Sequence, residues 1–291
     1  MSEDLARLSI NRATTRRWPL RELVAACVER GIGGIGLWRE DVTELGAEGA
    51  ARLVRGAGMS VTSLCRGGFF TDPDRAERRR RRDDNHRAID EAATLGAEVL
   101  VLVSGGIPPG DTDLAGARSR VVDAIAELVP YASQRGVRLA IEALHPMFCS
   151  DRCVVSTLDQ ALDIAEQSPV EAVGVVVDAY HVWWDPRLDQ AVRRAGERIV
   201  AFQVCDWVTP LPEGVLTGRG VMGDGCIPLR SLRRAVDSAG YDGPIEVEIF
   251  NDTLWNRPGP EVLELIVERY LAHVVEEPQP SPMVPRNDSR R

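Results

Sequence analysis

The sequence lacks long apolar runs, has few histidines and carries no excess of positive charge. No apolar stretch approaches the roughly 18 residues that a membrane-spanning helix needs. The first ten residues, MSEDLARLSI, lack the basic-then-apolar pattern of a secretory signal. The formal net charge of -9 argues against a nucleic-acid binder that relies on bulk charge. We therefore expect a cytoplasmic protein with no membrane or nucleic-acid partner.

Cysteine is present but forms no recognisable framework. The six cysteines are scattered, and several lie inside apolar runs, as buried thiols of a reduced protein do. Cys149 and Cys153 are four residues apart, but no second pair completes a zinc site.

The stretch GIGGIG at residues 31–36 matches the letters of a dinucleotide-binding fingerprint. That fingerprint must follow a strand and open a helix. Here the glycines follow a helical pattern and open a strand pattern, so we interpret them as a helix cap and a tight turn.

Short apolar runs alternate with longer helical patterns through most of the chain. The expected strands are residues 6–11, 33–38, 59–65, 97–106, 137–146, 173–180, 198–207 and 244–250. The expected helices are residues 19–30, 44–57, 74–95, 115–135, 157–167, 186–196, 228–239 and 260–275. Near-continuous apolar strands separated by helices indicate a parallel sheet. Strict alternation of eight strands and eight helices predicts an α/β fold of the TIM (β/α)8 barrel type, with a doubly wound open sheet as the alternative.

This barrel is expected to form a single domain over residues 1–275. The remaining residues, 276–291, are rich in proline and polar side chains, which predicts a disordered tail.

Polar residues stand at the ends of the last four expected strands, where a TIM barrel places its chemistry. They are Glu142 and His145, Asp178 and His181, Gln203 and Asp206, and Glu246 and Glu248. Carboxylates that converge in an apolar barrel would repel one another unless a cation lies between them. The pattern therefore predicts a divalent metal.

Strand alternation separates the two glutamates of PIEVEIF. Both point into the barrel, because Ile245, Val247 and Ile249 share the opposite face. Glu248 lies about 7 Å nearer the mouth and is our predicted ligand. We expect Glu246 to be an interior residue bonded to arginine or lysine.

The motifs IEALHP, VVDAYHVWWD, FQVCDW, RGVMGDGCI and GPIEVEIF together resemble the xylose isomerase-like TIM barrels. This superfamily of sugar isomerases and epimerases also contains inosose dehydratases and AP endonucleases. The resemblance implies that Glu142, Asp178 and Glu248 bind one metal ion and that His181 contacts substrate. Gln203 stands at the fourth ligand position, where relatives usually have histidine.

The resemblance implies an isomerase or epimerase of a small sugar or cyclitol that transfers a proton through a metal-stabilised enediolate. Glu142 or Glu248 would take the proton and the other would return it. Three carboxylates and an amide favour Mn²⁺, with Mg²⁺ or Co²⁺ as alternatives. The competing functions are a dehydratase of a keto-sugar or keto-cyclitol and a non-catalytic barrel. Four histidines are too few for the histidine-rich cluster of an AP endonuclease.

Other polar and aromatic residues have two interpretations each. Arg219 binds substrate oxygens or a phosphate, or is merely solvated. His145 contacts substrate or shapes the turn before Pro146. Asp206 orients a ligand from behind or caps a loop. Trp38, Arg66 and Ser104 end earlier strands, and from that position we expect them near the pocket, with Trp38 against substrate. The sequence leaves a homo-oligomer open.

Overall fold

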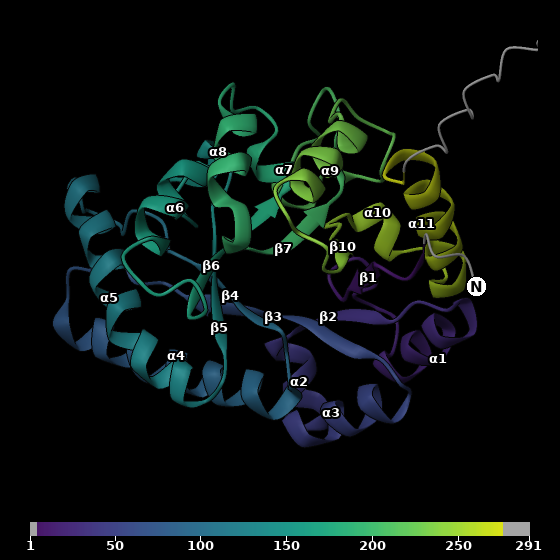
Figure 1. The fold of residues 1–291 in the computed structure, drawn as a ribbon, viewed down its shortest axis with the longest axis horizontal. Helices are drawn as coiled ribbons and strands as arrows, with labels where there is room; N and C mark the ends of the chain where they lie inside the picture. Colours follow the sequence, from purple (N-terminus) through teal and green to yellow (C-terminus); the bar gives the residue numbers. More distant parts are fainter. Residues whose placement is uncertain (1–4, 276–291) are drawn as a thin grey trace, which may run out of the picture.

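Eight parallel strands close on themselves in the computed structural model, which describes residues 5–275. Their order around the barrel is β1-β10-β7-β6-β5-β4-β3-β2 (Figure 1). The strands are β1 (Leu8–Asn11), β2 (Gly34–Trp38), β3 (Ser60–Gly68), β4 (Val99–Val103), β5 (Arg138–Glu142), β6 (Val173–Asp178), β7 (Ile199–Val204) and β10 (Ile245–Val247). The predicted TIM barrel is confirmed. The expected tail, residues 276–291, lies outside the described residues.

Helices cover the outside of the barrel (Figure 1). They are α1 (Leu20–Arg30), α2 (Arg39–Leu45), α3 (Ala47–Gly56), α4 (Arg75–Leu95), α5 (Leu114–Gln134), α6 (Leu158–Ala165), α7 (Ala179–Val182), α8 (Leu188–Ala195), α9 (Leu229–Ser238), α10 (Asp252–Trp255) and α11 (Gly259–His273). Short 3₁₀ turns occur at η2 (Pro146–Phe148), η3 (Gly196–Arg198) and η4 (Val215–Thr217). The helix expected over 44–57 is divided by Gly46, whose φ of 70° no helix can contain.

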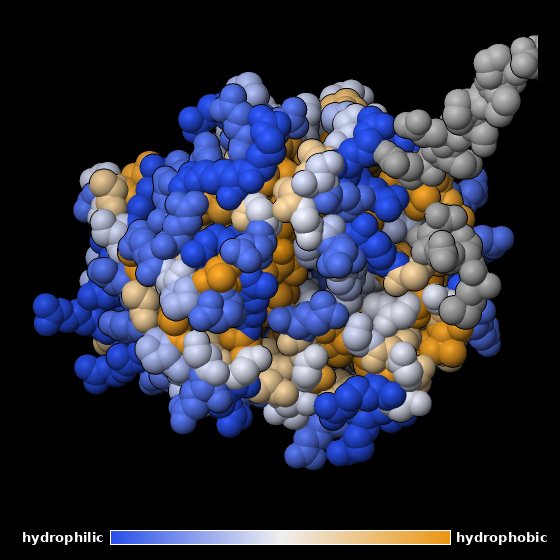
Figure 2. All heavy atoms as spheres, viewed as in Figure 1, coloured by the Kyte–Doolittle hydropathy of each residue, from blue (hydrophilic) through white to orange (hydrophobic). Residues whose placement is uncertain are grey.

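Hydrophilic residues dominate the outer helices on the face shown in Figure 2, and hydrophobic residues fill the spaces between them. The outward-facing side chains of the strands pack under these helices in one continuous core. No helix among residues 5–275 is long and apolar enough to cross a membrane. All six cysteines are free thiols.

The glycines of GIGGIG serve the cap and turn that we expected, and two of them also make room inside the barrel. Gly31 caps α1 in the left-handed conformation, with φ 75°. A Cβ on Gly36 would lie 2.6 Å from Oε2 of Glu246, and one on Gly34 would lie 2.8 Å from Ser9. The glycines of β2 therefore admit a polar layer to the barrel interior.

Glu246 is the centre of this layer. Its carboxylate accepts hydrogen bonds from Asn11 (2.7 Å), Thr62 (2.7 Å), Ser63 (2.9 Å) and Gln203 (2.9 Å). The expectation that it would pair with arginine or lysine is wrong. Uncharged donors from β1, β3 and β7 surround it, because short polar side chains fit the narrow barrel interior better than a long cation does.

Candidate active site

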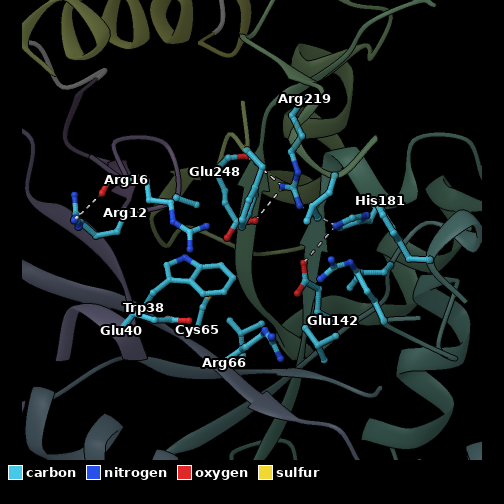
Figure 3. A pocket seen from close by; sticks show the side chains of 18 of the residues that line it. Arg12, Arg16, Trp38, Glu40, Cys65, Arg66, Glu142, His181, Arg219 and Glu248 are labelled. Atoms are coloured by element: carbon cyan, nitrogen blue, oxygen red, sulfur yellow. Dashed lines mark hydrogen bonds and ion pairs between the residues drawn. The ribbon is translucent and has the colours of Figure 1, made fainter. Parts of the chain in front are cut away.

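A cavity of about 390 Å³ opens at the C-terminal ends of the strands. Glu142, His181, Arg219 and Glu248 line it together with Trp38 and Arg66 (Figure 3). They come from segments spread over most of the chain, so only the closed barrel brings them together.

Three acidic side chains meet at this mouth. Glu142 ends β5, Asp178 ends β6 and Glu248 follows β10. Asp178 also caps α7, because its Oδ1 accepts a hydrogen bond from the backbone of Tyr180 at 2.8 Å. Ligand atoms of Glu142, Asp178 and His181 all lie within 4.8 Å of one another. This grouping offers carboxylate and imidazole donors suited to a divalent metal.

Arg219 inserts a positive charge between these acids. It lies in β9 (Arg219–Gly220), which pairs antiparallel with β8 (Asp206–Trp207). Its Nη1 is 3.0 Å from Oε2 of Glu248 and 3.4 Å from Oδ2 of Asp178. The rings of Tyr180 and Phe250 each lie 4.8 Å from its guanidinium carbon. The side chain is 4% exposed, so it is a fixed part of the site and not a solvated loop residue.

Burial makes the charged forms of these acids unfavourable. Burial, with the charges of Glu248 and Asp178, holds the pKa of Glu142 well above its usual range. Burial raises the pKa of Glu248 to about 8, although Arg219 opposes the shift. Burial also raises the pKa of Asp178, again against Arg219. All three carboxyl groups therefore have a raised pKa, which favours their protonated forms, and perturbed acids of this kind occur at proton-transfer sites.

Donors face both ring nitrogens of His181. The backbone N–H of His145 donates to Nδ1 at 3.2 Å, and Nη2 of Arg219 lies 3.1 Å from Nε2. A guanidinium only donates, so this second contact needs a lone pair on Nε2. Nε2 lies 3.6 Å from Asp178 and 4.0 Å from Glu142. Burial and the charge of Arg219 hold the pKa of His181 well below its usual range. His181 is thus a neutral ring held between the backbone N–H of His145 and the guanidinium of Arg219.

Gln203 lies beside the acids but turns its amide nitrogen away from the mouth. In the strand register it is opposite Asp178 on one side and Glu246 on the other. Its Nε2 donates to Glu246, and its buried Oε1 has no hydrogen-bond partner among the described residues. An unpartnered buried oxygen is what an unfilled ligand position would leave. Its role as a metal ligand stays a prediction.

The remaining predicted residues differ in whether they line the cavity. Trp38 lines the cavity, and its Nε1 donates to Asn11 at 2.8 Å. The ring of His145 packs instead against Trp207, 4.7 Å between centroids, away from the cavity lining. Asp206 accepts from backbone N–H groups of the loop that follows Arg219, among them Gly223 at 2.8 Å and Ile227 at 3.0 Å, which matches its loop-capping alternative.

The sequence did not predict most of the charged lining of the cavity. Arg66 was expected there only as a strand end, and four further charged lining residues were not predicted: Arg12, Arg16, Arg152 and Glu40. The first two follow β1, a half of the chain in which the motifs are vague. The signal that could have found them was position alone, namely charged residues directly after barrel strands.

A closed parallel barrel with converging acids, a histidine and a buried arginine at its C-terminal mouth defines a TIM-barrel protein with an enzyme-like site. The chain belongs to the xylose isomerase-like TIM barrel family, whose model matches residues 24–269. Similar sequences include proteins named 3-dehydroshikimate dehydratase and inosose isomerase, and solved structures of the same fold include D-psicose 3-epimerase and 3-keto-D-glucoside 4-epimerase.

Three comparisons illustrate the range of proteins that this chain resembles. The chain is 26% identical over 252 residues to a 3-dehydroshikimate dehydratase of Pseudomonas putida, covering 80% of this chain and 36% of that enzyme. It therefore spans about a third of that relative's length. Protein SMc04130 from Sinorhizobium meliloti 1021 shares 49% identity with a TM-score of 0.89, covering 93% of this chain and 99% of that one. The crystal structure of the IOLI protein with a bound zinc atom matches at 21% identity and a TM-score of 0.80, covering 92% and 98%.

Proposed function

We propose that this protein is a sugar or cyclitol isomerase or epimerase that moves a proton at a carbon next to a carbonyl. The observation that carries the proposal is the pair Glu142 and Glu248, two carboxyl groups of raised pKa that line one cavity. One would take a proton and the other would give one back, and a raised pKa makes a carboxyl group a better base when ionised and leaves it a proton to return when protonated.

The donors fit a divalent metal. Glu142 and Asp178, whose oxygens are grouped with His181, would hold it together with Glu248 from the same cavity, and the unpartnered oxygen of Gln203 would be a fourth, neutral donor. When bound, such an ion polarises a carbonyl and acidifies the neighbouring C–H bond. Oxygen donors favour Mn²⁺ or Mg²⁺, with Co²⁺ as a further alternative. The zinc in the IOLI protein is compatible with a divalent ion on this fold.

The chain's own groups would orient the substrate. Nη1 of Arg219 donates to Glu248, and its Nη2 lies 3.1 Å from Nε2 of His181. The guanidinium of Arg219 would stabilise substrate oxygen atoms that gain negative charge. The aromatic and apolar wall, which includes Trp38, Leu144, Phe148 and Phe250, would exclude water from the reacting carbon. None of the 291 residues is lysine, so a lysine Schiff base is not an alternative route.

A dehydratase is the second candidate, because the same pair of carboxyl groups can serve elimination. One group would remove the proton, and the other would protonate a leaving hydroxyl on the adjacent carbon, releasing water. The similarity to 3-dehydroshikimate dehydratase favours this alternative.

Exchange of substrate protons with deuterated water, followed by NMR across ketoses, aldoses and inososes with added Mn²⁺, tests both. An isomerase or epimerase exchanges the proton and keeps all oxygens, whereas a dehydratase also loses water. Glu142→Gln should lower turnover at least about 100-fold, since general acid–base groups contribute 10²–10⁴-fold. Turnover within a few-fold of wild type would refute the proton-transfer scheme. A metal-free protein that exchanges nothing would favour the non-catalytic barrel.

A further inference from the structure

Arg66 enters the cavity from an irregular point of its strand. Cys65 and Gly67 of β3 pair with consecutive residues of β4, Val101 and Leu102, so Arg66 is the extra residue of a β-bulge. Bulges redirect a side chain and recur beside active sites. Here the side chain lines the same cavity as Glu142 and Arg219 (Figure 3).

The guanidinium of Arg66 is held in place without an acceptor. Its carbon lies 4.2 Å from the centroid of the Phe69 ring. Stacking on an aromatic ring covers the face of the guanidinium and leaves the N–H groups of its edge available for a planar acceptor. Among the described residues, no hydrogen bond or ion pair within 4.0 Å joins this group to a carboxylate.

The electrostatic surroundings make this an unusual position for a cation. Burial lowers the pKa of Arg66, and the charge of Arg152 contributes to the shift. Glu40 and Glu142 oppose it, but neither approaches within ion-pair distance. Nε of Arg152 makes no hydrogen bond but lies 3.4 Å from Oδ2 of Asp151. Arg152 therefore has a carboxylate within ion-pair distance, and the neighbouring Arg66 has none among the described residues.

The other buried arginines of the cavity are already paired. Nε of Arg12 lies 3.0 Å from Oδ1 of Asp41, and Arg219 is bound to Asp178 and Glu248. Arg16 is exposed and lies over the Trp255 ring, 5.4 Å from its centroid. Arg66 is therefore a half-buried arginine of this cavity whose N–H groups have no carboxylate partner among the described residues.

We propose that Arg66, assisted by Arg152, binds an anionic group of the substrate, a carboxylate or a phosphate. The assignment rests on the proposed function only in taking the cavity as a substrate site. Arg66 would anchor the anion at one wall while Glu142, His181 and Arg219 face the reacting carbons. The substrate class is then a keto acid or a phosphorylated keto-sugar, and not a neutral sugar.

The test uses unreactive cyclitols, so that binding does not depend on turnover. Titration calorimetry measures affinity for quinate, a cyclitol carboxylate, for myo-inositol 1-phosphate, and for neutral myo-inositol. Wild-type protein should bind at least one anionic probe about tenfold or more tightly than myo-inositol, because a charge-assisted bidentate pair contributes more than a neutral hydrogen bond. The tighter of the two anions identifies carboxylate or phosphate.

Arg66→Gln should abolish this preference and leave myo-inositol binding unchanged. Arg66→Lys should restore part of it, since lysine keeps the charge but loses the planar fork. The matched control is Arg16→Gln, which removes the same charge from the same mouth at an exposed position. If Arg66→Gln and Arg16→Gln lose the same amount of anion preference, the preference comes from the general positive potential of the mouth. That result would overturn the assignment.

Failure of this assignment is distinguishable from failure of the proposed function. Turnover of a neutral keto-sugar together with no anion preference would overturn the role of Arg66 and leave proton transfer standing. An Arg66-dependent anion preference without proton exchange on any keto substrate would support the anion site and refute the isomerase.

Discussion

Among residues 5–275, Arg219 is the cation that pairs with the buried acids Asp178 and Glu248, and removing it should be severely destabilising. Arg219→Met keeps most of the side-chain volume between the rings of Tyr180 and Phe250. It leaves Glu248 and Asp178 without the guanidinium that lies 3.0 Å and 3.4 Å from them. Breaking a buried ion pair by removing one partner costs about 3–5 kcal/mol. We expect a loss in that range at pH 8 in the presence of EDTA.

The loss should depend on pH in a defined direction. Without Arg219 the pKa values of Glu248 and Asp178 rise further, because the opposing charge is gone. Groups whose pKa is raised in the folded state contribute stability at low pH and lose it as pH rises through the folded pKa. The difference in free energy of unfolding between wild type and Arg219→Met should therefore grow from pH 6 to pH 8.5, as measured by urea titration.

A divalent metal should replace the missing charge. Saturating Mn²⁺ at 100 times its dissociation constant would return about 2.7 kcal/mol to Arg219→Met. The matched control is Arg12→Met, which breaks the buried pair with Asp41 outside the acid cluster. It should lose stability too, but Mn²⁺ should restore it no more than it stabilises wild type. Equal rescue of both variants, or a loss below about 1 kcal/mol in Arg219→Met, would contradict the reasoning.

The remaining predictions concern Gln203, Glu246 and Glu248. Gln203→His should tighten Mn²⁺ binding, read by calorimetry, if position 203 is a ligand position; unchanged affinity would remove it from the ligand set. Glu246→Ala leaves four buried donors without an acceptor and should lower the free energy of unfolding by about 3 kcal/mol or more. A near-neutral effect would mean that water replaces the carboxylate. In EDTA, wild-type stability should fall as pH rises from about 5 to 8, because the pKa of Glu248 is about 8 in the folded protein, against an ordinary 4.5. Glu248→Gln should flatten that slope.

The barrel could be predicted because its strands, its helices and the faces of its strands all follow from short local patterns in the sequence. Apolar runs bounded by glycine and helical patterns place the eight strands, and alternation points Glu246 and Glu248 inward. The register then makes neighbours of Gln203 and Glu246 without further information. The boundaries were less accurate. The last strand, expected over 244–250, is only Ile245–Val247, because the chain bends toward Thr14, whose Oγ1 accepts from the backbone N–H of Ile249.

The sequence pointed to Arg219 and Arg66 but could not predict which groups they contact, because their contacts depend on loop geometry. Arg219 follows a long irregular segment, and its guanidinium reaches the acids only since β9 folds back onto β8. Arg66 enters the cavity through a bulge that alternation rules do not foresee. The partners of Glu246 were mispredicted for a related reason. A charge-pairing rule suggested arginine, whereas the barrel interior has space only for short donors.

The buried acids of the site and the groups placed against them are linked by charge balance. Three buried acids need positive charge, and the chain supplies one cation in Arg219 and an amide, not an imidazole, in Gln203. A neutral amide is a weaker ligand than imidazole, so a metal here must compete with a resident guanidinium using a poorer donor set. Metal affinity should therefore be set by Arg219 as much as by Gln203. The double variant Arg219→Met with Gln203→His should bind Mn²⁺ more tightly than either single variant, and additive gains would show that the two act independently.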